Sequence, residues 1–396
     1  MNIIYNNQEN FTSNISKFLL NCNNNIRKSQ LKIIPSIILG MILSESCVSS
    51  DIAKELKDEF SLIKFDSVIK RIKRLFSNKL FDPYSFYDSI ITNVIKSYKK
   101  KHPDKRVHII FDHMFSHDNF TVFMISMRIG TQGIPLWFRC FKGKDYSEAF
   151  KLNVITEGID YVSNLFNDDF HLIFLADRWF NSTDLMEHID KLGHTFCLRL
   201  KGTYKVTYFD KIKKHNVETY TQNLSGLKYT CKYYNDISYT DKNYKVNIVI
   251  SDSVGSNQTP WIISTNGDPR RAVKDYSYRF GGIECMFKNQ KSNGFYIESS
   301  VNCSLKYFTS MYALVCFSTL FLTLFGADYT KNSRCYKKIN LTTHKKFKDG
   351  SRKRVMSLFN IGLLYLNVLS ILIFISESLT ILYYMMYNVY SNFCFL

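Results

Sequence analysis

One stretch of the sequence places an acid and two bases at the spacing of a single helix face. In the run DYSYRFGGIECMFKNQKSNGFYIES, Glu284, Lys288 and Lys291 follow one another at i, i+4 and i+7. Residues at this spacing lie on the same side of a helix. A carboxylate flanked by two ammonium groups can hold a metal ion beside a phosphate. The same spacing is also typical of a solvated helix face with an ion pair, and on spacing alone that is the simpler interpretation.

Two aspartates at the ends of predicted strands favour the site over the solvated face. VHIIFD ends in Asp112 and HLIFLAD ends in Asp177, and both are short apolar runs of the kind that forms buried strands. Sheets of α/β proteins place their ligands at the carboxyl ends of the strands. With Glu284, the two aspartates form a candidate site of three carboxylates. His113 follows Asp112 directly, and because neighbouring strand residues point to opposite faces we expect it to be structural.

The predicted elements around these residues alternate as in an α/β domain. After VHIIFD come the strands NFTVFMISMRIG and IPLWFRCFKG, a helix over 147–166, the strand HLIFLAD, a helix over NSTDLMEHIDKLG and the strand TFCLRLKG. This order resembles the ribonuclease H-like fold, a mixed α/β sheet whose first and fourth strands are parallel neighbours. We therefore expect such a domain over 105–330, with Trp137 and Trp179 in its core.

The span 203–265 differs from the chain around it. It alternates Tyr, Val and Thr with Lys and Asn, which predicts an antiparallel β unit inserted between the second aspartate and the helix that bears Glu284. Trp261 lies in this span, in PWIIST, where a buried strand residue, which we favour, and a surface aromatic are both open.

The charge of the chain points to a polyanionic partner. Lysine and arginine number 52 against 34 acidic residues, a net charge of +18, which favours nucleic acid or a membrane surface. Residues 1–100 are predicted to be helical. The run FDSVIKRIKRLF carries Arg71 and Arg74 opposite its apolar stripe and resembles a helix-turn-helix unit, with an ordinary helical bundle as the alternative. The basic run from Lys96 to Arg106 predicts a domain boundary.

These features together resemble the insertion-sequence DDE transposases of the insertion sequence four group. The third acid of that group lies in a motif of Tyr, two residues, Arg, three residues, Glu, six residues and Lys. Tyr276 and Arg279 keep the first spacing and Glu284 and Lys291 keep the last, but four residues separate Arg279 from Glu284. LADRWF and IIFDHM are similar to the two aspartate motifs of the family, and a β insertion at this position is a family trait.

The resemblance implies a transposase that cleaves DNA at transposon ends and transfers the strand into target DNA. It implies two Mg²⁺ or Mn²⁺ ions held by three carboxylates, whose hard oxygens suit these metals. The implied catalytic residues and metal ligands are Asp112, Asp177 and Glu284. The DNA contacts we expect are Tyr276, Arg279, Lys288, Lys291, Trp261, Arg71 and Arg74. The implied partners are double-stranded DNA and a second copy of the chain on paired ends, in the cytoplasm of a prokaryote at the nucleoid.

Two apolar runs near the carboxyl end suggest a different class. Residues 308–326 and 358–375 approach the roughly 20 residues that span a bilayer, and the basic stretch 345–354 fits a positive-inside argument. Because Ser, Thr and Asn interrupt both runs, we expect no membrane span, a buried helix at the first run, and a basic loop with a helical region over 331–396. An integral membrane protein with a basic cytosolic domain and a catalytically dead DNA-binding transposase remnant stay as alternatives.

Overall fold

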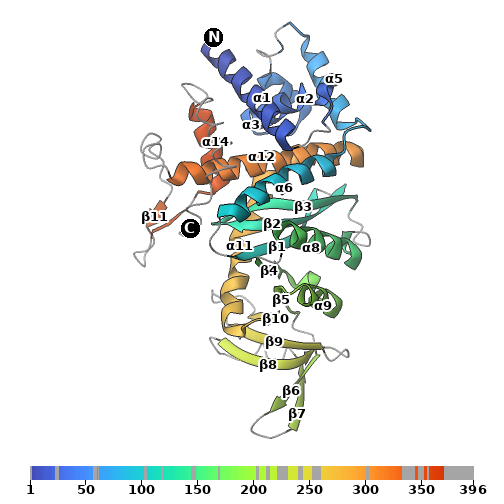
Figure 1. The fold of residues 1–396 in the computed structure, drawn as a ribbon, viewed down its shortest axis with the longest axis vertical. Coiled ribbons are helices and arrows are strands. Elements are labelled where there is room, and N and C mark those ends of the chain that lie inside the picture. Colours follow the sequence, from blue (N-terminus) through green and yellow to red (C-terminus); the bar gives the residue numbers. More distant parts are fainter. Residues whose placement is uncertain are drawn as a thin grey trace.

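The structure is a computed structural model of the 396-residue chain. It describes residues 2–22, 26–56, 60, 62–101, 105–116, 119–143, 149–167, 170–201, 205–210, 215–220, 231–239, 244–251, 260–299, 303–331, 344–346, 352–354 and 356–369. The chain is an α/β structure with a mixed sheet. Helices from both terminal regions gather at one end, and the sheet extends away from them (Figure 1).

Ten strands form one continuous sheet in the order β3-β2-β1-β4-β5-β10-β9-β8-β6-β7. The strands are β1 (Arg106–Ser116), β2 (Phe120–Ile129), β3 (Gln132–Lys142), β4 (His171–Ala176), β5 (Thr195–Arg199), β6 (Lys205–Asp210), β7 (His215–Tyr220), β8 (Cys231–Tyr239), β9 (Tyr244–Ser251) and β10 (Trp261–Thr265). Strands β1, β4 and β5 are parallel to one another, and the other neighbours pair antiparallel. The first and fourth strands are therefore parallel neighbours, as the sequence predicted.

The register of β1 against β4 places the two aspartates at equivalent positions. The last parallel pair joins Ile110 to Leu175, and Asp112 and Asp177 each lie two positions beyond it. Two steps along a strand return a side chain to the same face. Our expectation that Asp112 ends its strand is wrong: β1 continues to Ser116 because its second half pairs with β2.

Helices pack against part of the sheet and make up the amino-terminal region. They are α1 (Asn2–Cys22), α2 (Lys28–Leu31), α3 (Ile34–Ser44), α4 (Ser49–Glu55), α5 (Phe65–Phe76), α6 (Pro83–Lys101), α8 (Leu152–Phe166), α9 (Thr183–Lys191), α11 (Pro269–Lys291), α12 (Leu305–Lys331) and α14 (Leu358–Leu369), with short 3-10 turns η1 (Arg178–Phe180) and η2 (Ile297–Ser299). The basic run expected as a linker is partly helical, since α6 continues through Lys101. Lysine is a good helix former, so its charge does not end the helix.

The strands of the predicted insertion extend the main sheet. Every described segment between 205 and 265 apart from Pro260 is a strand, in agreement with the predicted β character. Strand β10 pairs with β5 through Ile263 and Arg199, so the unit continues the sheet at an edge that β5 would otherwise leave unpaired. The division at 203–265 thus falls within one continuous sheet.

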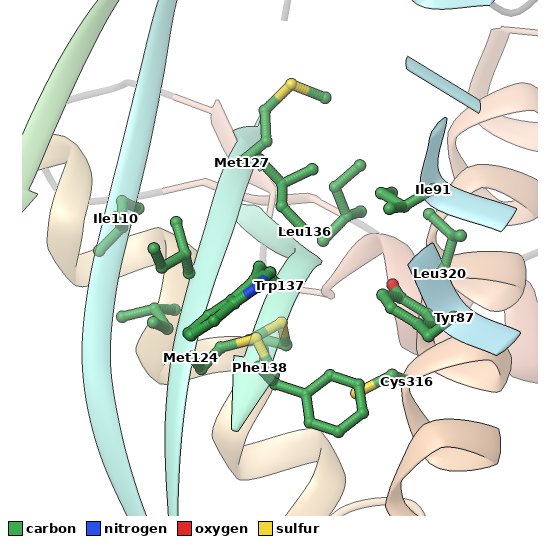
Figure 2. Packing of buried hydrophobic residues seen from close by; sticks show 14 of the residues in the cluster. Tyr87, Ile91, Ile110, Met124, Met127, Leu136, Trp137, Phe138, Cys316 and Leu320 are labelled. Carbon is green, nitrogen blue, oxygen red and sulfur yellow. The ribbon is translucent and has the colours of Figure 1, made fainter. Parts of the chain in front are cut away.

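The core lies where β3 meets α6 and α12. The Phe138 ring lies 5.7 Å from Tyr87 of α6 and 5.1 Å from Tyr312 of α12 between ring centroids. Figure 2 shows the ring of Phe138 directed from β3 toward the side where Tyr87 and Cys316 lie. Trp137 is 1% exposed, which confirms its predicted core position.

Helix α12 contains the first of the two apolar runs. In the part of the chain described, Leu305–Ala327 is the single helix long and apolar enough to cross a membrane. Its apolar stretch of 18 residues is entirely buried inside the protein. The helix pair Lys28–Ser44 and Ser49–Glu55 passes the same test only when joined across a 95° bend. As expected, the first run forms a buried helix beside β3.

The second apolar run packs on the first. Helix α14 crosses α12 at Gly326 and Gly362, where a Cβ would lie 1.8 Å from Leu358 O and 2.1 Å from Leu322 O, respectively. Only glycine permits two backbones to approach this closely. Residues 370–375 of the run lie outside the described residues. The short hairpin β11 (His344–Lys346) and β12 (Arg352–Arg354) precedes α14.

Candidate active site

Each of the two aspartates has one carboxylate oxygen fixed by the local backbone. Asp112 Oδ1 accepts the N–H of His113 at 2.9 Å, and Asp177 Oδ1 accepts the N–H of Arg178 at 2.7 Å. Both Oδ2 atoms face the same nitrogen, Arg279 Nη2, at 2.7 Å for Asp112 and 3.9 Å for Asp177. The two Oδ2 atoms therefore lie at most 6.6 Å apart.

Helix α11 carries the third carboxylate. It begins at Pro269, well before Gly281 and Gly282, and runs through both glycines. Asp268 caps the helix by accepting the N–H of Arg270 at 2.9 Å, and proline is favoured at the first helical position. Tertiary packing offsets the low helix propensity of the two glycines.

Gly282 allows α11 to lie close to the sheet. A Cβ at Gly282 would be 2.3 Å from Ile110 Cδ1, and a Cβ at Gly133 would be 3.1 Å from Gly282 O. Ile110 precedes Asp112 by two residues and shares its face of β1. The close contact at Gly282 therefore sets the distance between α11 and the aspartates.

Arg279 joins all three carboxylates. Its Nη1 donates to Glu284 Oε1 at 3.0 Å while its Nη2 donates to Asp112, and its side chain is 7% exposed. Five residues advance a helix by roughly 500°, so Arg279 and Glu284 leave it about 140° apart. Both side chains are long enough to meet above it. The additional residue between them does not separate these two groups.

The local charges and burial act in opposite directions on the acids. Burial raises the pKa of Asp112, and the neighbouring Arg279 opposes this. The pKa of Glu284 is raised by the same cause and opposed by the same cation. Burial acts to lower the pKa of Arg279, but the carboxylates, Asp112 foremost, outweigh it and the pKa rises. Additional positive charge at the site would stabilise the ionised forms of Asp112 and Glu284.

The donor chemistry of this cluster suits a hard divalent cation. Carboxylate oxygens are the ligands that Mg²⁺ and Mn²⁺ prefer, and three of them converge from β1, the turn after β4, and α11. Within the described residues, no group of three or more His, Cys, Asp or Glu side chains has the arrangement of a metal site. Here the guanidinium of Arg279 lies between the carboxylates.

The other predicted residues of α11 are placed differently. Lys291 Nζ pairs with Glu298 Oε1 at 3.1 Å, and Lys288 is exposed one turn after Glu284. Tyr276 is fully buried, and burial raises its pKa to about 12. Its hydroxyl has no hydrogen-bond partner among the described residues. A DNA contact by Tyr276 would require α11 to separate from its surroundings.

Three aromatic rings join β10 to α11 beside Arg279. The half-buried Trp261 stacks on Phe280 with ring centroids 5.0 Å apart and packs edge-on against Tyr276 at 5.5 Å. Phe280 is 37% exposed. Trp261 is thus half-buried, intermediate between the buried strand position and the surface position that the sequence left open. Of its two ring partners, Phe280 is the exposed one.

Trp179 and His113 are the remaining residues whose environments the sequence predicts. Trp179 is 68% exposed, so its predicted core position is wrong: the η1 turn directs Phe180 inward and Trp179 outward. His113 is structural in its contacts, since its ring stacks on Phe150 at 3.7 Å and Nε2 lies 2.9 Å from Ala149 O. Burial lowers the pKa of His113 to about 4.

The predicted basic face in the amino-terminal region borders a cavity. Arg71 and Arg74 of α5 are exposed and line a cavity of 560 Å³ together with Lys32 and Phe60. The Arg71 guanidinium lies 5.8 Å from the centre of the Phe60 ring. Three cations around one cavity form a surface that suits phosphate groups.

Comparison with known proteins finds similar chains among solved structures. Neither protein-family profiles nor curated proteins match the sequence. Among solved structures, a piggyBac transposase in a synaptic complex with hairpin DNA is similar over 97% of this chain and 82% of that chain, at a TM-score of 0.42 and 14% identity. At this TM-score we infer neither fold family nor activity from the match.

Sequence reasoning missed the anchor that ties α11 to β1. Asp275 Oδ2 pairs with Arg106 Nη2 at 2.7 Å, and Asp275 Oδ1 lies 2.9 Å from His108 Nε2. Asp275, Arg279 and Gly282 follow one another at i, i+4 and i+7. Helical spacing counted from before the glycines would have placed all three on the face toward the sheet.

Proposed function

We propose that this protein is a DDE-type transposase of the Tyr-Arg-Glu-Lys group, with a ribonuclease H-like catalytic domain over 105–330. The observation that carries this proposal is the meeting of Asp112, Asp177 and Glu284 on one buried guanidinium. The carboxylates come from two adjacent parallel strands and a later helix. An ion pair within one helix or one turn would not bring these three segments together. The strand order β3-β2-β1-β4-β5 supports the fold assignment.

The residues of the site have distinct tasks in this proposal. When bound, two Mg²⁺ or Mn²⁺ ions would activate the attacking oxygen and stabilise the leaving oxygen of a phosphodiester. Asp112 and Asp177 would hold these ions with oxygens that the backbone already orients. Glu284 would complete the ligand set from a position that is 47% exposed. Arg279, Lys288 and Lys291 would bind phosphates beside them.

The remainder of the chain would bind and position DNA. The amino-terminal region over 1–100 would contact the transposon end through Arg71 and Arg74, and the net charge of +18 favours a polyanion. We propose a homodimer on paired ends, with double-stranded DNA as substrate and target, in the cytoplasm of a prokaryotic cell. Of the predicted basic loop and helical region over 331–396, the described parts are the hairpin β11–β12 and helix α14, and the rest lies outside the described residues.

Strand cleavage and joining on DNA that carries the flanking element ends tests the proposal. We expect nicked and joined products with Mg²⁺ or Mn²⁺ and none after chelation, with binding that weakens steeply as salt rises. The guanidinium of Arg279, which lies between the three carboxylates, favours a second candidate, a DNA-binding remnant without activity. Salt-dependent binding without cleavage would select the remnant, and recovery only from detergent-extracted membranes would contradict both.

A further inference from the structure

The guanidinium of Arg279 occupies the carboxylate oxygens that a divalent cation would need. Asp112 Oδ1 and Asp177 Oδ1 each accept a backbone N–H, so Oδ2 is the oxygen that each aspartate directs to the centre of the site. Arg279 Nη2 lies 2.7 Å from Asp112 Oδ2 and 3.9 Å from Asp177 Oδ2. Its Nη1 lies 3.0 Å from Glu284 Oε1. The cation between the three carboxylates is therefore supplied by the protein itself.

The polar contacts of this guanidinium are confined to the acids. Within the described residues, its hydrogen bonds go to Asp112 and Glu284, and its Nε is buried without a hydrogen-bond partner. A buried donor without a partner costs free energy. Among the described residues, the carboxylates are thus what holds the guanidinium in place, and the position leaves one of its donors unsatisfied.

Arg279 cannot leave these carboxylates by losing its proton. A guanidinium stays charged in proteins, so a divalent cation that binds the same oxygens must displace the whole group. The planar fork of an arginine binds phosphate in the same bidentate manner as carboxylate. Because Glu284 is 47% exposed, one side of the cluster is open to solvent. A DNA phosphate on that side offers Arg279 an equivalent partner.

We infer that Arg279 is a resident counterion that closes the carboxylate site to divalent cations until a DNA phosphate takes up its guanidinium. Metal binding and DNA binding are then coupled, and by linkage each strengthens the other by the same factor. This inference rests on the proposed function, because it requires a divalent cation and DNA at the same cluster. It gives the guanidinium a role in an active enzyme, whereas a remnant would keep it on the carboxylates permanently.

Binding of Mn²⁺ to the full-length chain, followed by the paramagnetic resonance of the free ion, tests the inference. Without DNA, Arg279→Gln should bind Mn²⁺ about 5- to 150-fold more tightly than the wild type, the usual range of coupling between two ligands. Arg271→Gln removes the same charge from an exposed position of the same helix and should bind Mn²⁺ like the wild type.

The same titration with DNA measures the release of Arg279. The duplex ends at the element boundary, so that no bond remains to be cut there. On this duplex the wild type should gain Mn²⁺ affinity, and the difference between the wild type and Arg279→Gln should shrink, because the phosphate has then taken up the guanidinium. Only the Mn²⁺ binding that Asp112→Asn loses is counted, which excludes ions held by the DNA alone.

A second substitution at the same position keeps the test decisive. Arg279→Lys retains the positive charge and lacks the fork that joins two carboxylates. It should bind Mn²⁺ with an affinity between those of the wild type and Arg279→Gln. If Arg279→Gln does not fold, Arg279→Lys takes its place in both titrations.

Equal Mn²⁺ affinity of the wild type and Arg279→Gln without DNA would overturn the inference, as would a difference that DNA leaves unchanged. The proposed function would stand in either case, because Mg²⁺-dependent cleavage at element ends tests it separately. A wild type that binds no Mn²⁺ at the cluster even on DNA would overturn both and would leave Arg279 as a permanent occupant of the site.

Discussion

Replacing Arg279 with glutamine should destabilise the protein in a pH-dependent manner. The guanidinium is the common partner of Asp112, Asp177 and Glu284 and is 7% exposed. The substitution leaves three carboxylates around a neutral side chain. Like charges then repel, and the pKa values of Asp112 and Glu284, which burial already raises, should rise further.

The size of the effect follows from the exposure of the partners. Removing one member of a fully buried ion pair costs about 3–5 kcal/mol of unfolding free energy. Here Asp112 is 22%, Asp177 25% and Glu284 47% exposed at the side chain. Solvent screens part of the repulsion, so we expect about 2–3 kcal/mol near neutral pH.

The sign of the pH dependence is fixed by the raised pKa values. A carboxyl whose folded pKa exceeds its unfolded pKa contributes stability below the unfolded value and loses it as pH rises through the folded value. Because Arg279 limits this loss in the wild type, the deficit of Arg279→Gln should be small near pH 4 and grow toward neutrality.

Urea unfolding at several pH values measures this deficit. Arg271→Gln, on an exposed position of the same helix, is the matched control and should change stability by less than about 0.5 kcal/mol at every pH. Added Mn²⁺ should narrow the deficit of Arg279→Gln at neutral pH. A variant as stable as the wild type at neutral pH, or a deficit independent of pH, would refute the reasoning.

Three further predictions concern packing, a second ion pair and DNA binding. Gly326→Ala should lower the free energy of unfolding, measured by thermal denaturation, by more than about 3 kcal/mol, because its Cβ would be 1.8 Å from a backbone oxygen. Gly281→Ala, whose nearest contact would be 3.8 Å, should instead gain up to about 1 kcal/mol. Burial acts to raise the pKa of Asp275, but its hydrogen bond with His108 contributes to a net lowering. Wild-type stability should therefore fall as pH falls below about 4, and Asp275→Asn should lose that part of the urea-unfolding profile. Lys291→Ala should change the free energy of unfolding by under about 1 kcal/mol. It should reduce the slope of log affinity against log salt concentration by about 0.9, the value for one phosphate contact on duplex DNA.

The sequence was most informative where the chain forms short buried strands. Apolar runs ending in Asp112 and Asp177 predict the parallel pair β1 and β4, because such runs have few alternatives to a central strand. The three-strand, helix, strand, helix, strand order resembles the ribonuclease H-like fold, and that resemblance implies that the first and fourth strands are neighbours. These signals are local, and the structure bears out the strand pairing that they imply.

Contacts between distant segments were less accessible from the sequence. The sequence does not reveal where α11 begins, because Gly281 and Gly282 have low helix propensity, whereas packing on Ile110 favours glycine within a continuous helix. The extension of the sheet by β10 depends on an edge pairing that leaves no mark on the local pattern. Trp179 was expected in the core, and a single 3-10 turn reverses that expectation.

Cleavage of element-end DNA by three isosteric variants tests the shared carboxylate site most directly. Asp112→Asn, Asp177→Asn and Glu284→Gln each keep the shape of the side chain and remove a charge that a hard cation needs. The account predicts that every one of them loses Mg²⁺-dependent cleavage while binding DNA as tightly as the wild type or slightly more tightly. Wild-type cleavage by any one of the three would show that its carboxylate is not a metal ligand and would contradict the account.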